Sequence, residues 1–383
     1  MKHRPLMKDV LKIIWFYVCI WLVIVFILSS LSSFIKPASF SFISLSGLAF
    51  PYLLVIFFVF IIINFFVRKR LAYFMMIFLP LAYFNTISTF ALRPAKPWQT
   101  KKDSLALRIM TWNVQSFVNY LYHEQTSSDY HTTKEDMLSL IHRYDPDVLC
   151  FQEYKNIENA KRRRSIKEQL DSLGYKYYFC SNDKNGNLPK NQNVTIENGV
   201  AIFSKLSLLD SGRININHSD RIENLIYADV LLNNKPIRIY TAHLQSFTIY
   251  TDTAQKNQDR NIYEITYHRR ISAQFKIRET EVKHQEEVAI IRKAIDSTRH
   301  PVIYCGDLNT TPTSYNYRFL KGNNLQDAFI KKGSGIGNTF YKLGPTLRID
   351  VCLADTALQV LQCKRDKKKL SDHYPVITDV KWK

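Results

Sequence analysis

The sequence predicts an α/β domain, in which two sheets pack together under flanking helices, preceded by three transmembrane helices. Three observations lead to this fold class. Long uncharged apolar stretches open the chain, short β-rich runs then alternate with helical patterns, and polar residues follow most of the predicted strands. A chain of 383 residues has room for such a module and a large core. We divide it into a membrane module (1–92), a linker (93–104) and a soluble domain (105–383).

The membrane module contains three apolar stretches, 13–31, 42–67 and 71–92, that carry no acidic or basic side chain. Each is close to or above the ~20 residues that a helix needs to cross the hydrocarbon core. A buried helical hairpin of a soluble protein is a weaker interpretation, because three such stretches follow one another. A cleaved signal peptide also fits poorly, since its apolar region is only ~7–15 residues long and precedes a small-residue cleavage site.

The basic residues beside these stretches predict the orientation of the module. Four precede the first stretch, and Arg68, Lys69 and Arg70 fill the connection between the second and third, whereas the first connection has only Lys36. With three crossings, both basic clusters lie in the cytoplasm and the soluble domain lies on the non-cytoplasmic side, periplasmic or extracellular. The basic residues of segment 93–102 oppose this orientation.

Charge divides the chain as sharply as hydropathy does. From Met1 to Trp98 there are ten basic residues and one acidic residue, Asp9, so the remainder carries 42 basic and 32 acidic residues. This moderate excess suits a polyanionic substrate or an anionic lipid surface, but a solvated basic face explains it equally well. The six cysteines show no metal-ligand spacing and are predicted to be buried apolar side chains, with one bridge among Cys180, Cys352 and Cys363 left open.

After the linker, β-rich runs alternate with helical patterns. The predicted strands are 107–112, 148–152, 200–203, 226–232, 237–242, 302–306, 349–353 and 376–380. The predicted helices are 134–143, 162–173 and a long amphipathic one at 270–297. Strands and helices mixed in this way predict an α/β domain with two packed sheets.

Polar residues with metal, phosphate or proton chemistry follow most of these strands. They are Asn113, Glu153, His243, Asp307, Asn309 and Asp350, with Asp372 and His373 just before the last strand. A single residue of this kind is most often a turn or a helix cap. Because rigid sheets present reactive side chains at the ends of their strands, so many in one domain favour a functional site.

These residue types suit the cleavage of a phosphoester. That reaction needs a hard cation to neutralise the phosphate, an activated water and polar groups that hold the phosphate for in-line attack. Oxygen ligands select Mg²⁺, with Mn²⁺ as the alternative, and Glu153 is the best candidate ligand. An Asp–His pair such as Asp350 and His373 supplies a general base or stabilises the transition state, provided that the fold brings the two together.

Six motifs occur in order along the soluble domain: IMTWNVQSF, DVLCFQEY, AHLQS, VIYCGDLNTTP, LRIDVCLAD and KKLSDHYPV. This series resembles that of the endonuclease/exonuclease/phosphatase superfamily, which includes pancreatic-type deoxyribonuclease, class II apurinic-site endonucleases, inositol polyphosphate 5-phosphatases and neutral sphingomyelinases. The resemblance covers about residues 105–383. It implies a four-layered α/β sandwich, in which two mixed sheets pack face to face between helices.

The resemblance also implies a metal site. Asn113 and Glu153 match the pair at the metal in this superfamily, and Asp372 of the closing SDH motif lies near the metal. Members are described with one or two metal ions.

Five further residues match positions that handle the phosphate or its protons. His243 resembles the histidine that contacts the scissile phosphate or acts as an acid near the leaving group. Asp307 matches the aspartate that orients or deprotonates the attacking water, and Asn309 the asparagine that holds phosphate. Asp350 matches the aspartate that orients His373, which serves as general base or transition-state stabiliser.

Two departures bear on the branch of the superfamily. Gln115 and His243 stand where apurinic-site endonucleases carry other residues, which favours the deoxyribonuclease and sphingomyelinase branches. The stretch 247–283 is longer and more polar than a minimal connection. It is either a solvated helix with Glu/Lys pairs or a substrate-facing arm, in which Tyr250, Tyr263 and Tyr267 alternate with basic residues.

Three functions remain open on these grounds. The first is a membrane-anchored, metal-dependent phosphoester hydrolase, a phosphodiesterase or phosphatase, that acts on a lipid head group or similar phosphoester at the bilayer. The second is a surface-exposed nuclease that cleaves DNA or RNA. The third is a catalytically idle, membrane-tethered binding protein, which the complete set of motif residues disfavours. No obligate protein partner is expected.

Overall fold

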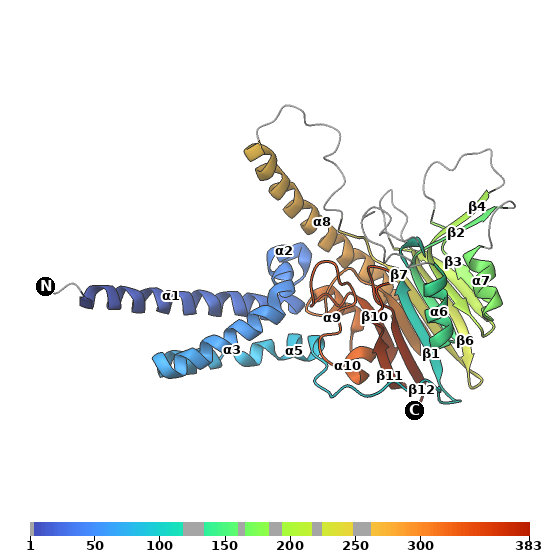
Figure 1. Cartoon of the computed structure of the whole chain (residues 1–383), viewed down its shortest axis with the longest axis horizontal. Helices are drawn as coiled ribbons and strands as arrows, with labels where there is room; N and C mark the ends of the chain where they lie inside the picture. The colour runs from blue at the N-terminus through green and yellow to red at the C-terminus, as the bar shows by residue number, and fades with distance from the viewer. Residues whose placement is uncertain (1–3, 118–133, 160–164, 184–193, 217–223, 248–261) are drawn as a thin grey trace. The chain divides into compact units, whose positions relative to one another are not determined.

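The computed structural model describes residues 4–117, 134–159, 165–183, 194–216, 224–247 and 262–383 (Figure 1). By its contacts the chain forms two compact units. The helical unit comprises residues 1–89 and 311–318, and the sandwich unit comprises residues 90–310 and 319–383. The domain boundaries that we predicted remain a prediction.

The helical unit consists of apolar helices joined by short connections. They are α1 (Arg4–Leu31), α2 (Pro37–Ser46), α3 (Phe50–Val67), α4 (Lys69–Met76) and α5 (Tyr83–Thr89). Together with the 3₁₀ turns between them they form three helical stretches, 7–34, 37–67 and 69–89, each long and apolar enough to cross a membrane. The three apolar stretches predicted from the sequence are therefore helical.

Aromatic contacts join α1 to α3 within this unit. The rings of Phe26 and Phe57 stack with their centroids 3.9 Å apart, and those of Trp15 and Phe60 stack at 5.1 Å. Trp15 Nε1 also donates a hydrogen bond to Asn64 Oδ1 at 3.0 Å. An amide buried among apolar side chains needs such partners, because an unsatisfied polar group is costly where water is absent.

The segment 311–318 joins this unit through hydrogen bonds to the helix ends. Ser32 Oγ donates to the carbonyl of Thr313 at 2.7 Å, and Thr313 Oγ1 donates to the carbonyl of Gly47 at 2.8 Å. A Cβ at Gly47 would lie 2.6 Å from Ser32 Oγ, so this close approach requires glycine. The segment that follows strand β8 (Val302–Asp307) and its loop is thus part of the helical unit.

The sandwich unit contains two six-stranded sheets (Figure 1). The first sheet has the order β11-β12-β1-β2-β4-β3, with bounds Leu358–Arg365, Val376–Trp382, Leu107–Asn113, Val148–Asn159, Val194–Ser204 and Tyr177–Cys180. The second has the order β5-β6-β7-β8-β10-β9, with bounds Asp210–Asn215, Asn224–Leu232, Lys235–His243, Val302–Asp307, Asp350–Asp355 and Leu325–Asp327. Among the described strands each sheet has one parallel pair at its centre, β1–β2 and β7–β8.

The core lies between the two sheets, with helices on their outer faces. Ile109 and Ile202 from the first sheet pack with Ile239 and Ile303 from the second. On the outer face of the first sheet lie α6 (Lys134–Tyr144) and α7 (Ile166–Ser172). The long α8 (Ile262–Asp296) precedes β8, and α9 (Tyr315–Lys321) and α10 (Ala328–Lys332) follow it. This is the predicted four-layered α/β sandwich.

All eight predicted strands and all three predicted helices occur, whereas β3, β5, β9 and β11 were not predicted. The sequence of β5, DSGRIN, has one apolar residue, so its pairing with β6 comes from the sheet and not from local preference. The cysteines are all buried and free, including the three for which a bridge was left open. Of the proposed arm, residues 248–261 with Tyr250, and the side chains of Tyr263 and Tyr267, lie outside the described part of the chain.

Candidate active site

The first sheet brings two site residues to the point where the parallel pairing of β1 with β2 ends, at the end of β1 and in the middle of β2. Asn113 ends β1 and pairs in register with Gln152 of β2. Directly after it, Glu153 has a positive φ of 51°, and the β2–β4 register shifts between Phe151 and Tyr154. This bulge turns Glu153 toward Asn113, whose Nδ2 lies 3.0 Å from Glu153 Oε1.

The second sheet aligns three more residues across neighbouring strands. His243 at the end of β7 pairs with Asp307 at the end of β8, and Asp307 pairs in turn with Asp350 at the start of β10. This row fixes the spacing of the three side chains by strand register. At Gly306 a Cβ would lie 2.4 Å from the carbonyl of Ala242, so glycine is required beside Asp307.

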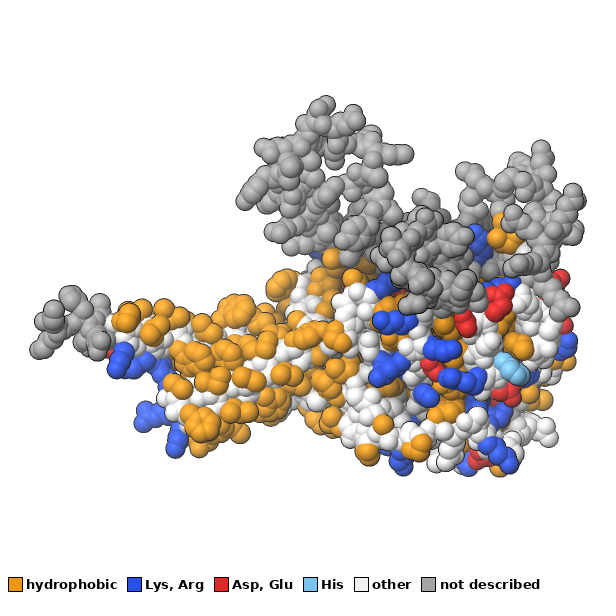
Figure 2. All heavy atoms as spheres, viewed as in Figure 1, with side chains coloured by type: hydrophobic (Ala, Val, Ile, Leu, Met, Phe, Trp, Pro, Cys, Tyr) orange, Lys and Arg blue, Asp and Glu red, His pale blue; other side chains and the backbone are white. Residues whose placement is uncertain are grey.

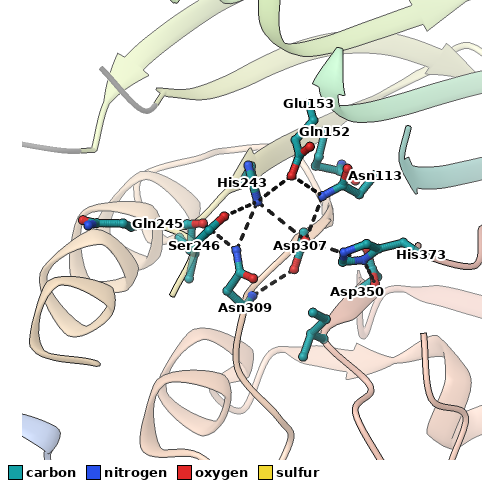
Figure 3. A network of polar contacts seen from close by, with 12 residues as sticks. Asn113, Gln152, Glu153, His243, Gln245, Ser246, Asp307, Asn309, Asp350 and His373 are labelled. Carbon is teal, nitrogen blue, oxygen red and sulfur yellow. Dashed lines mark hydrogen bonds and ion pairs between the residues drawn. The ribbon is translucent and has the colours of Figure 1, made fainter. Parts of the chain in front are cut away.

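A hydrogen-bond network joins the residues of the two sheets (Figure 3). Asn113 Nδ2 donates to Asp307 Oδ2 at 3.1 Å as well as to Glu153. His243 Nε2 lies 3.6 Å from the same Asp307 oxygen and 3.1 Å from Asn309 Nδ2. The fold therefore gathers these predicted site residues around the Asp307 carboxylate.

Asn309 is held in place by its own backbone conformation. Its φ is 48°, its N–H donates to Asp307 Oδ1 at 2.9 Å, and its Nδ2 donates to the carbonyl of Leu244 at 2.8 Å. A residue other than glycine in the left-handed region is uncommon, and such positions concentrate at functional sites.

His373 and Asp350 form the predicted pair. His373 Nδ1 lies 2.8 Å from Asp350 Oδ2 and 3.6 Å from Asp307 Oδ2, and all three side chains are buried. Trp112 Nε1 donates to the carbonyl of His373 at 2.9 Å, which ties this turn to β1. Nδ1 is thereby occupied, and Nε2 is the imidazole nitrogen left for another partner.

Charge and burial have opposite effects on the pKa values of His373 and Asp307. Burial alone would lower the pKa of His373, but the negative charges of Asp350 and Asp307 outweigh it and raise that pKa to about 10. Burial would likewise raise the pKa of the Asp307 carboxyl, yet the charges of His373 and His243 hold it below its ordinary value. At neutral pH the site thus pairs a carboxylate with an imidazolium.

Asp372 lies at the edge of the network. Its Oδ2 accepts a hydrogen bond from Gln115 Nε2 at 2.9 Å and lies 3.8 Å from Lys342 Nζ. Burial raises the pKa of the Asp372 carboxyl, and the nearby charge of Glu153 adds to that effect while His373 opposes it. Asp372 is thus electrostatically coupled to the site, and Gln115 is the side chain that orients it.

Gln152 is a buried polar residue that sequence reasoning missed. Its Nε2 donates to Thr241 Oγ1 at 2.9 Å and to Thr111 Oγ1 at 3.1 Å, so it bridges the two sheets beneath the site. The sequence does contain a signal for it: the glutamine amide stands at a strand position where the alternation of side chains points into the core.

His284 and Glu287 of α8 were missed as well. His284 Nε2 lies 2.6 Å from the carbonyl of Gln245, and Gln245 N–H donates to Glu287 Oε2 at 3.3 Å. The backbone N–H and carbonyl of Gln245, two residues after His243, are thus both bound by side chains of α8. The spacing of three places these two side chains on one helix face, a signal that the sequence does contain.

The oxygen donors of the site fit a divalent cation. The ligand atoms of Asp307, Asp350 and His373 lie within 4.8 Å of one another in buried positions, but the imidazole of His373 already holds a proton, so the carboxylates are the available ligands. Glu153 is the more accessible carboxylate, with 39% of its side chain exposed. Carboxylate and carboxamide oxygens are the ligands that hard cations such as Mg²⁺ prefer.

Two packed mixed sheets, with carboxylates, carboxamides and imidazoles at their central strand ends, define the fold and the site of a class of phosphoester hydrolases. Residues 110–373 match the Endonuclease/Exonuclease/phosphatase family, and the chain therefore belongs to this family of phosphoester-cleaving enzymes. Residues 11–90 match a domain of unknown function (DUF8431).

Relatives and solved structures agree with this family. A DNA-(apurinic or apyrimidinic site) endonuclease of Dictyostelium discoideum is 23% identical over 246 residues, which cover 64% of this chain and 53% of that protein. The chain thus spans about half the length of this curated relative. An endonuclease/exonuclease/phosphatase from Beutenbergia cavernae has a similar structure, with a TM-score of 0.50 and 18% identity over 72% of each chain.

The human Nocturnin catalytic domain is another similar structure. Its TM-score is 0.46 at 19% identity, and the match covers 73% of this chain and 94% of that domain. At these identities the likeness to solved structures shows the fold alone.

Proposed function

We propose that the chain is a membrane-anchored, divalent-metal-dependent phosphodiesterase. The observation that carries the proposal is the network around Asp307, in which side chains from the ends of both sheets meet within hydrogen-bonding or ion-pair distance. The residues of this network lie within 110–373, the range that matches a family of phosphoester hydrolases.

In this proposal Asn113, Glu153 and Asp372 hold Mg²⁺, with Mn²⁺ as the alternative. A bound ion of this kind neutralises phosphate oxygens and lowers the pKa of its water. Asp350 and His373 already share a 2.8 Å hydrogen bond, so we assign them to proton and charge chemistry and not to the metal.

The remaining residues act on the substrate. Asp307, with its lowered pKa, is ionised and orients or deprotonates the attacking water. His373 keeps its proton and donates a hydrogen bond from Nε2 to a phosphate oxygen, which stabilises the charge of the transition state. Asn309 and His243, whose Nδ2 and Nε2 atoms lie 3.1 Å apart, hold the phosphate and face the leaving group.

Two histidines flank Asp307, and in this proposal they share the proton and charge chemistry of phosphoester cleavage. His243 Nε2 and His373 Nδ1 each lie 3.6 Å from Asp307 Oδ2. An alkoxide leaving group needs a proton, so one imidazole serves the leaving oxygen while the other stabilises the phosphate.

Two substrate classes follow from different observations. The helical unit, with three helices of membrane-spanning length, favours a phosphodiester presented at a bilayer, such as a lipid head group. The similarity to an endonuclease of apurinic or apyrimidinic DNA favours a nuclease. In either case we propose that the sandwich unit lies on the non-cytoplasmic side, because Arg68, Lys69 and Arg70 would then be cytoplasmic.

An activity panel tests the proposal on the full chain in mild detergent. The substrates are an aryl phosphodiester, an aryl phosphomonoester, DNA with and without abasic sites, RNA, and choline and inositol phospholipids, each with Mg²⁺, Mn²⁺ or chelator. We expect metal-dependent cleavage of diesters that is lost in Asp307→Asn and kept in Asp171→Asn, a matched surface control.

The pattern of cleavage selects the substrate. Phospholipid cleavage would identify the membrane-surface hydrolase, and cleavage of nucleic acid that falls steeply with salt would identify the nuclease. Equal rates with chelator and with metal would refute the metal-dependent mechanism. No turnover on any substrate would reduce the chain to a catalytically idle binding protein.

A further inference from the structure

An apolar groove lies beside three basic residues in the helical unit. Phe16 and Ile20 of α1 and Leu71 and Phe74 of α4 line it, and its volume is about 570 Å³. That volume lies within the range of ~300–1,000 Å³ that small-molecule sites occupy. Arg68, Lys69 and Arg70 also line this groove, so charge and apolar surface meet in one place.

A break in the helix places the three basic side chains there. Arg68 has φ −149° and ψ 79°, which ends α3 and lets α4 begin at Lys69. The first hydrogen bond of α4 is donated by Leu71 N–H to the carbonyl of Arg68 at 2.8 Å, and the positive end of the helix dipole at Lys69 adds to the attraction for an anion. Arg68 is half-buried, whereas Lys69 and Arg70 are exposed.

The helical unit has no carboxylate to neutralise these charges. Asp9 is the only acidic residue between Met1 and Trp98, and its Oδ1 already lies 2.8 Å from Lys12 Nζ. Figure 2 shows Lys and Arg side chains gathered at one end of the hydrophobic helical unit. Within residues 1–98 these three basic residues therefore have no other acidic residue as a candidate partner.

We propose that the groove binds one anionic phospholipid. Its phosphate pairs with Arg68, Lys69 and Arg70, and an acyl chain lies on Phe16, Ile20, Leu71 and Phe74. Basic pockets between membrane helices bind anionic head groups in this manner. An orienting role in insertion explains the charges but not the apolar groove beside them. This inference rests on insertion of the helical unit in a bilayer, and it is independent of the chemistry of the sandwich unit.

Spin-label electron paramagnetic resonance tests the site directly. The full chain is reconstituted in phosphatidylcholine vesicles that contain a trace of spin-labelled phosphatidylglycerol or spin-labelled phosphatidylcholine, and the motionally restricted fraction of each is measured. Because each basic residue near an anionic lipid contributes about a fivefold preference, we expect phosphatidylglycerol to be favoured at least fivefold.

Substitutions distinguish the contribution of the basic side chains from that of the apolar groove. Lys69→Gln/Arg70→Gln should lower the preference severalfold while Arg68 remains, whereas Lys8→Gln/Lys36→Gln, which removes the same charge elsewhere in the unit, should keep it. Ile20→Trp fills the groove and should lower the preference although all three basic residues remain. Helix content by circular dichroism confirms that each variant folds.

Several outcomes would overturn the proposal. Equal restriction of both lipids by the wild type, or an unchanged preference in Lys69→Gln/Arg70→Gln, would exclude a charged site. Displacement of the labelled lipid by glycerol phosphate as effectively as by whole phosphatidylglycerol would exclude the groove. Absence of any restricted lipid would instead show that the unit is not inserted, a failure distinct from any loss of hydrolase activity.

Discussion

His284 should make the folded state sensitive to mild acid, and His284→Gln should remove that sensitivity. Burial lowers the pKa of His284 to about 4, and the hydrogen bond to the carbonyl of Gln245 only partly opposes it. The charge of Asp307 also raises this pKa, and that of His243 lowers it. A glutamine at this position can still donate to Gln245, but it cannot take up a proton.

The magnitude follows from the two protonation equilibria. The unfolded chain binds a proton at His284 below pH 6.5, whereas the folded chain does so only near pH 4. The folded-state pKa is lowered, so stability is unaffected above pH 6.5 and falls as the pH drops from 6.5 to 4. At about 1.36 kcal/mol per pKa unit, the free energy of unfolding falls by ~3 kcal/mol between pH 7 and pH 4.

Thermal unfolding of the full chain in non-ionic detergent measures this difference. A change of ~3 kcal/mol corresponds to roughly 6–12 °C in melting temperature for a domain of ordinary size. Other groups titrate in the same range, so the quantity compared is the pH-dependent loss in the wild type minus that in His284→Gln. His142→Gln, at an exposed position of α6, is the control. An equal loss in wild type and His284→Gln would refute the reasoning.

Three further predictions concern the site and its support. Asp307→Asn should lower kcat/KM by roughly 10²–10⁴-fold while circular dichroism shows a folded chain, because the ionised carboxylate is lost; near-normal turnover would contradict its role. Asp350→Asn should lower the pKa of His373 markedly, since burial is then less opposed, and an imidazole that still titrates near 10 by NMR would count against the pair. Arg108→Met should cost ~3–5 kcal/mol in denaturant unfolding, because Asp379, 2.7 Å from Arg108 Nε, becomes a buried unpaired charge. Arg108→Met/Asp379→Leu should recover most of that loss, and a double variant as unstable as the single one would exclude this explanation.

The strands that could be predicted from the sequence are the central ones. β1 and β8 are buried at every position and consist largely of apolar residues, so local composition alone identifies them. β5 is half-exposed and polar, and β11 pairs with β12 through a register shift after Val360. Their existence depends on a neighbouring strand, which is a long-range property that a local pattern does not contain.

The site residues were predictable as residue types at strand ends, but their geometry was not. The left-handed conformations of Glu153 and Asn309 place their side chains. Asparagine is enriched in that region but glutamate is not, so the residue type at position 153 gives no signal for it. For the stretch that includes the helix before β8, one of the two interpretations was a solvated helix with Glu/Lys pairs, and Glu279 and Lys283 form one such pair at 2.8 Å. His284 follows directly, yet it faces the interior, because one residue along a helix turns the side chain by about 100°.

The contacts of Thr313 have a consequence for the order of events during synthesis. The helical unit is discontinuous in sequence, because Ser32 and Gly47 are made early and their hydrogen-bond partner only some 270 residues later. The three apolar helices therefore leave the ribosome before their unit can be completed, and β8 is already made when Thr313 arrives. A fragment that begins after residue 89 would leave Thr313 without Ser32 and Gly47, four residues beyond Asn309. Truncation of the helices would thus also leave the segment 311–318 without the rest of its unit.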